Sequence, residues 1–221
     1  MVITRGYDRL VNLSDAVIAI AVTLLILPLV DAAGAIGTTP PGDFLYEQGE
    51  QLFLFALSFV VIADFWLIHH RLYRQIDGYT IPLVWWNFLW LLTIVFLPFP
   101  TVLLGESSAA SPVTSGLYIG TMVVTTYAGV AQQLIIVRRP ELQLESARGT
   151  VRLSSSVVPA AAMTAAFLVS VFVPGTGVWP LLILIPTGFI ERQWAKSRRT
   201  RQSVATPTPK QAPTSTDTPG A

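Results

Sequence analysis

The chain has 221 residues, of which 52% are hydrophobic and only 12% carry a charge, with a net charge of +1 at pH 7. The charged fraction is about half that of soluble globular proteins, and the mean hydropathy is +0.58. These values argue against a soluble, disordered or nucleic-acid-binding protein. The absence of cysteine excludes disulfides, cysteine zinc ligands and a cysteine nucleophile. We therefore expect an all-α membrane protein.

Six apolar stretches approach the length of about 20 residues that a helix needs to cross a bilayer. The second of them could begin as early as Phe44, and the sixth is short and contains Pro180 and Pro186. We expect residues 1–195 to form one six-helix transmembrane domain. Residues 196–221, rich in Thr, Pro and Ser, are expected to form a disordered cytoplasmic tail. In chain order the stretches cover residues 10–30, 51–70, 81–104, 113–137, 153–173 and 178–191.

The basic residues alternate with these stretches. All 14 Lys and Arg residues lie before the first stretch, between the second and third, between the fourth and fifth, or after the sixth. The connections 31–50, 105–112 and 174–177 contain none of them and carry five acidic residues instead. The positive-inside rule then predicts a multi-pass protein of the cell membrane with both termini cytoplasmic. A cleaved signal peptide at the first stretch is the alternative, but it would leave an odd number of spans.

Ionisable side chains at membrane depth are costly and usually functional. Asp15 lies near the cytoplasmic end of the first stretch, where Asp8 and Asn12 share its helix face. We expect Asp15 to belong to a structural polar network, with direct ion binding as the alternative. Asp64, in the second stretch, lies seven residues before Arg71, a spacing that favours a salt bridge on one helix face.

His69 and His70, the two histidines of the chain, end the second stretch. Adjacent residues of a helix point to different faces, whereas metal-binding histidines on a helix are typically four residues apart. Two ligands are also too few for a metal site, so we expect no metal and no cofactor. Hydrogen bonds to Asp15, Asn87 or Ser14 are the expected role. A membrane-embedded enzyme that uses the histidine pair would need further ligands, and we do not expect an enzyme.

Branched apolar residues form a stripe along the first stretch. Ile20, Leu24 and Leu27 fall within about 60° of one another on a helix, and Thr23 flanks them. Spacing alone favours helix packing as the use of this stripe. Around a symmetry axis, the same stripe would form a hydrophobic constriction that gates ion flow by dewetting, with Thr23 adding a ring of hydroxyls.

The segment Arg9-Leu-Val-Asn-Leu-Ser-Asp15 resembles a family signature, R-x-x-x-F-S-D. This signature opens the first helix of the transmembrane protein 175 family of potassium channels, and Leu13 here replaces its Phe. Similarity continues at Trp66, His69-His70, Asn87 and Phe96-Leu-Pro-Phe99, so that it covers about residues 5–104. The second half is similar only in the number of spans. The resemblance implies a bacterial member: a homotetramer with six helices per subunit, whose pore is lined by helix 1 without a re-entrant filter loop.

The resemblance also implies roles for individual residues. Ile20, Leu24 and Leu27 would form the pore constriction, and Thr23 would influence potassium preference. The expected function is thus a potassium-conducting cation channel whose partners are its own copies, the lipid bilayer and the permeant potassium ion. A proton-coupled secondary transporter, with Asp15 or Asp64 as the titrating carboxylate, stays open as the alternative. The structural polar network would comprise Arg9, Ser14, Asp15, His69 and Asn87.

Overall fold

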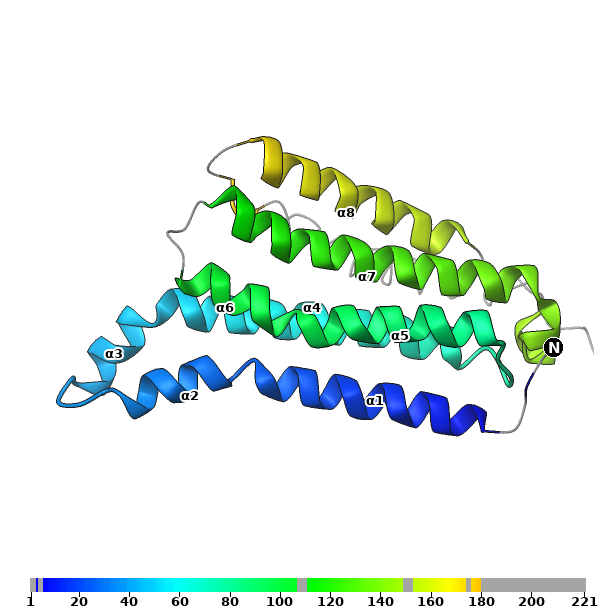
Figure 1. The fold of residues 1–221 in the computed structure, drawn as a ribbon, viewed down its shortest axis with the longest axis horizontal. Helices are drawn as coiled ribbons and strands as arrows, with labels where there is room; N and C mark the ends of the chain where they lie inside the picture. Colours follow the sequence, from blue (N-terminus) through cyan, green and yellow to red (C-terminus); the bar gives the residue numbers. More distant parts are fainter. Residues whose placement is uncertain (1–2, 4–5, 107–110, 149–152, 174–175, 180–221) are drawn as a thin grey trace, which may run out of the picture. The chain divides into compact units, whose positions relative to one another are not determined.

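The structure is a computed structural model that describes residues 3, 6–106, 111–148, 153–173 and 176–179 (Figure 1). Almost all of the expected sixth stretch, from residue 180 onward, and the expected tail lie outside the described residues. The described part is helical apart from short connections. Its elements are α1 (Tyr7–Leu24), α2 (Leu27–Gly34), α3 (Pro41–Glu47), α4 (Gly49–Tyr73), α5 (Ile81–Phe96), α6 (Pro98–Glu106), α7 (Pro112–Arg138), the 3-10 turns η1 (Pro140–Leu142) and η2 (Glu145–Ala147), and α8 (Ser154–Phe172).

Four helical stretches in the described part are long and apolar enough to cross a membrane. They correspond to the first four stretches expected from the sequence. The fifth expected stretch forms α8, whose shorter apolar portion is Pro159–Phe172. The expected all-α membrane architecture is therefore confirmed for the part that the structure describes. The four are Tyr7–Gly34, Gly49–Tyr73, Ile81–Glu106 and Pro112–Arg138.

Two of these stretches are broken where a proline follows. The first changes from α1 to α2 at Leu25 and Ile26, whose amides reach back three residues instead of four, to Val22 and Thr23. The third changes from α5 to α6 at Leu97, directly before Pro98. Proline has no amide hydrogen and fits the first turn of a helix, so α2 and α6 begin as new helices.

The described helices pack against one another in neighbouring pairs (Figure 1). Helix α7 packs against both α5 and α8, and α1 packs against α5 and α4. Small residues permit the close approach of α7 and α8: a Cβ on Gly120 would lie 3.2 Å from the Phe167 ring. A buried apolar cluster that includes Ile62, Ile94, Tyr118 and Met122 fills the space between α4, α5 and α7.

Backbone hydrogen bonds join the connections at one end of this bundle. Ile3 and Tyr79 exchange two bonds of 2.9 Å, which tie the segment before α1 to the loop between α4 and α5. The Asp77 amide donates to the Leu142 carbonyl at 3.2 Å, which ties that loop to the segment after α7. We call this end the basic end, because its helix ends and connections carry the exposed arginines Arg71, Arg74, Arg138 and Arg148.

Candidate functional site

Helix α1 has one face that the rest of the chain covers and one face that it does not. The covered face consists of Leu10, Ser14, Ile18 and Ala21, which recur every three or four residues. On the opposite side the structure leaves the predicted stripe uncovered: Ile20 is 60% exposed, Leu24 38% and Leu27 48%. Packing among the described residues therefore does not account for this stripe, although spacing alone favoured that use.

Thr23 is exposed beside the uncovered stripe. Its hydroxyl donates to the backbone carbonyl of Ile20 at 2.8 Å. The hydroxyl hydrogen is thus used within the helix, a common arrangement for Thr in apolar helices.

A series of hydrogen bonds links the covered face of α1 to α5 and α4. Ser14 Oγ donates to the Leu10 carbonyl at 3.0 Å, and it accepts from Asn87 Nδ2 at 3.0 Å. The amide oxygen of Asn87 then accepts from His69 Nε2 at 2.8 Å. Since Asn87 offers an oxygen, His69 must carry its proton on Nε2. Ser14 and Asn87 are fully buried, so α1, α5 and α4 are joined by satisfied polar groups inside an apolar bundle.

Aromatic rings hold His69 in this position. Its ring stacks against Tyr73 at a centroid distance of 4.2 Å and against Trp90 at 4.3 Å. His70 stacks on Trp66 instead, at 5.1 Å, so the two histidines do not converge. Within the residues that the structure describes, no group of three or more His, Asp and Glu side chains is placed to hold a metal ion. The geometry gives His69 a positioning role.

Asp15 forms a second link between α1 and α4. Its carboxylate accepts a hydrogen bond from the indole Nε1 of Trp66 at 2.8 Å. Arg9 is exposed, and its guanidinium bonds to none of these groups among the described residues. Of the expected network, the structure thus brings Ser14, His69 and Asn87 together, pairs Asp15 with an indole and leaves Arg9 outside.

A second buried series of hydrogen bonds was not predicted from the sequence. Thr101 donates to the Leu97 carbonyl at 2.8 Å, and its oxygen lies 2.9 Å from that of Ser58, which lies 2.9 Å from that of Tyr118. Because the Thr101 hydrogen is used on the carbonyl, Ser58 donates to Thr101 and Tyr118 donates to Ser58. All three side chains are buried. This series fixes the start of α6 against α4 and α7. Single hydroxyls in apolar helices give little signal, because they usually bond to their own helix.

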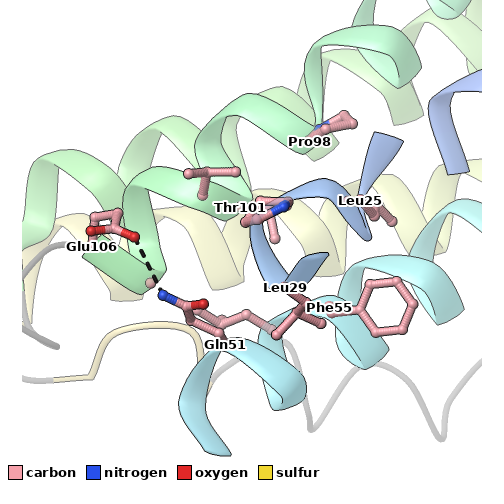
Figure 2. A pocket seen from close by; sticks show the side chains of 11 residues that line it. Leu25, Leu29, Gln51, Phe55, Pro98, Thr101 and Glu106 are labelled. Atoms are coloured by element: carbon pink, nitrogen blue, oxygen red, sulfur yellow. Dashed lines mark hydrogen bonds between the residues drawn. The ribbon is translucent and has the colours of Figure 1, made fainter. Parts of the chain in front are cut away.

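Two hollows lie where the broken helices face each other. A cavity of about 20 Å³, room for about one water molecule, is lined by Leu25, Leu29, Phe55 and Thr101 among others (Figure 2). The adjoining groove of about 410 Å³ is open and is lined by residues of α2 and α6 and by Gln48 and Gln51. Gln51 Nε2 donates to Glu106 Oε1 at 3.3 Å across this region (Figure 2).

Comparison with known proteins points to one family. Residues 9–98 match the profile of the family described as "Endosomal/lysosomal potassium channel TMEM175". A potassium channel of Chamaesiphon minutus is 31% identical over 123 residues, which cover 52% of this chain and 61% of that protein. A potassium channel of Streptomyces collinus is 33% identical over 126 residues, which cover 54% of this chain and 59% of that protein. The matched region thus spans about three fifths of the length of these relatives.

The fold is similar to a solved structure over most of the chain. The crystal structure of a lysosomal potassium-selective channel TMEM175 homolog from Chamaesiphon minutus superposes with a TM-score of 0.63. The similarity covers 81% of this chain and 92% of that chain, at 22% sequence identity. It therefore extends beyond the matched N-terminal half and includes helices for which the sequence resemblance was weak.

Proposed function

We propose that this chain, whose residues 9–98 match the TMEM175 family, is a member of that family and a subunit of a potassium-conducting channel. In this proposal four copies assemble in the cell membrane with both termini cytoplasmic and with α1 around the central axis. The uncovered stripe on α1 is the observation that carries the proposal. A subunit that buries Ser14, Ile18 and Ala21 but leaves Ile20 60% exposed directs one face of its first helix away from its own core.

Four such stripes around an axis would form stacked apolar layers of Ile20, Leu24 and Leu27. A narrow apolar layer obstructs ions because water leaves it, so no re-entrant filter loop is required. The links from Ser14 to Asn87 and from Asp15 to Trp66 would hold the cytoplasmic half of α1 at a fixed rotation. Their role is to keep the layers in register. We assign Arg9, which is exposed in the subunit, a partner on a neighbouring copy.

The test is ion flux through purified protein in liposomes under opposed potassium and sodium gradients, with and without a proton gradient. Ile20→Asn should wet the constriction and raise the flux about tenfold, which corresponds to a barrier lower by about 1.4 kcal/mol. The matched control is Leu92→Asn, which places the same side chain at a residue of α5 that is 64% exposed. That variant should conduct like the wild type.

Unchanged flux in Ile20→Asn would contradict the assignment of Ile20 to the constriction. Flux that saturates and follows the proton gradient would favour the alternative, a proton-coupled transporter that uses Asp15 or Asp64.

We assign potassium preference to Thr23. Removing the hydroxyl in Thr23→Ala should shift the reversal potential toward that of a channel with less preference for potassium over sodium, because the polar ring beside the apolar layers is lost. The hydroxyl bonds only to its own helix among the described residues, so the substitution leaves packing intact. An unchanged reversal potential would exclude Thr23 from selectivity.

A further inference from the structure

The two helices of the first membrane-length stretch are held to the rest of the subunit unequally. Four residues of α1 are buried, and hydrogen bonds at Ser14 and Asp15 join this helix to α5 and α4. Helix α2 has no buried residue. Its one polar side chain, Asp31, is exposed and forms no hydrogen bond or ion pair among the described residues. Within the subunit, α1 is therefore fixed more firmly than α2.

The backbone between α1 and α2 has few hydrogen bonds that resist bending. The amides of Leu25 and Ile26 donate to carbonyls three residues earlier at 3.3 and 3.4 Å, longer than the usual distance of about 2.9 Å. Pro28 has no amide hydrogen, so the Leu24 carbonyl lacks the donor that residue 28 provides in a continuous helix. Sharp bends of helices occur at such interruptions. Leu25 and Ile26 are therefore the point about which α2 can turn.

The cavity of about 20 Å³ lies between this break and the start of α6 (Figure 2). Leu25 and Leu29 line it on one side, and Pro98 and Thr101 line it on the other. The bond from Ser58 to Thr101 holds this part of α6 against α4. Close-packed side chains resist displacement, whereas a cavity beside them permits it. Leu25 and Leu29 can therefore shift while the start of α6 stays in place.

We infer that α2 is a hinged outer segment of the pore-lining helix, which swings about Leu25 and Ile26 against the fixed start of α6. This inference rests on the proposed channel function and concerns how the pore opens. Because α1 stays in place, the swing moves the Leu27 layer and leaves the Ile20 layer where it is. An apolar layer passes ions only when it is wide enough to stay wet, so Leu27 acts as a second gate in series with Ile20.

Distances between spin labels test the hinge without relying on conduction. The cysteine-free chain permits a nitroxide pair at Leu27→Cys and Phe59→Cys, in which Phe59 is an exposed reference on α4. Diluting labelled copies with unlabelled ones restricts the measurement to one subunit. Double electron–electron resonance in liposomes should give a broad distance distribution for this pair. The matched pair Ile20→Cys and Phe59→Cys should give a narrow one, because Ile20 belongs to α1.

Pro28→Ala supplies the missing donor to the Leu24 carbonyl and should make α1 and α2 one stiffer helix. The Leu27 pair should then narrow to the width of the Ile20 pair. In single-channel recordings, switching between conductance levels should slow roughly fivefold, because bending now breaks a backbone hydrogen bond. Pro41→Ala is the matched control, since Pro41 begins α3 after a loop and its new amide joins no two helices. It should leave both measurements unchanged.

The outcomes separate the hinge from the proposed function. Equal widths for the two label pairs, in a protein that conducts, would overturn the hinge and leave the channel intact. Narrowing in Pro28→Ala without slower switching would overturn the assignment of Leu27 as a gate. A wild type that does not conduct would overturn the channel and its gate, whereas the label distances would still decide whether α2 turns.

Discussion

Ser58 illustrates how polar side chains inside the bundle are used at the scale of single residues. Its hydroxyl accepts from Tyr118 and donates to Thr101, both at 2.9 Å, and all three groups are buried. Removing one member of such a chain leaves its partner without a hydrogen bond. Removing both partners of a bond costs much less, because no buried polar group is then left unpaired.

Ser58→Ala should therefore lower the free energy of unfolding by about 1–3 kcal/mol, since the Tyr118 hydroxyl stays buried without an acceptor. The double variant Ser58→Ala/Tyr118→Phe should regain part of that loss. Thermal unfolding of the detergent-solubilised protein measures both. The control is Tyr127→Phe, whose hydroxyl bonds to Thr164 at an exposed site and should matter little. A double variant less stable than Ser58→Ala would contradict the directional chain.

Side-chain partners were only partly predictable from the sequence. Similar depth in the membrane indicated that His69, Asn87 and Ser14 could meet, and the structure joins them. The same reasoning did not identify Trp66 as the donor to Asp15. Depth follows from position along a stretch, whereas a bond between helices also depends on how each helix is rotated about its axis. The sequence of one helix does not determine that rotation.

At the scale of helices, hydropathy located the spans but not their breaks. The first and third stretches were expected to be continuous over 10–30 and 81–104. The structure breaks them at Leu25–Ile26 and at Leu97. An average over about 20 residues hides a proline, because proline is tolerated in the first turn of a new helix. The first break falls between Leu24 and Leu27, so the predicted stripe is divided between two helices.

Periodicity could not decide the use of the apolar stripe on α1, since packing and a pore constriction require the same spacing. The decisive information is which face of the helix the other helices cover. The small or polar residues Ser14 and Ala21 are both fully buried, whereas the larger Ile20 is exposed. Hydrophobicity alone would have placed Ile20 inside the bundle. An exposed branched residue at this position therefore faces either lipid or a neighbouring copy, and cross-linking distinguishes the two.

At the scale of the whole molecule, the arginines of the described residues gather at the basic end, on helix ends and on connections that backbone bonds tie together. Asp31 and Glu106 lie in the groove beside the α1–α2 break. The positive-inside rule predicts that the basic end is cytoplasmic.

In the proposed assembly around α1, equivalent residues of neighbouring subunits would lie close together. In the cysteine-free chain, Ile20→Cys should therefore give covalent dimers with a short bismaleimide, seen on a denaturing gel after treatment of membranes. Ala21→Cys is the matched control: one residue further along the same helix, its side chain is fully buried within the subunit and should stay unlinked.

Leu92→Cys tests whether the copies meet along α5 instead of along α1. Leu92 is as exposed as Ile20 but belongs to α5, so it should stay unlinked if the copies meet along α1. Dimers from Leu92→Cys with none from Ile20→Cys would place α5 between the copies and leave the α1 stripe against lipid. A pore lined by α1 would then be wrong, because an apolar stripe against lipid encloses no ion pathway, whatever ions the protein conducts.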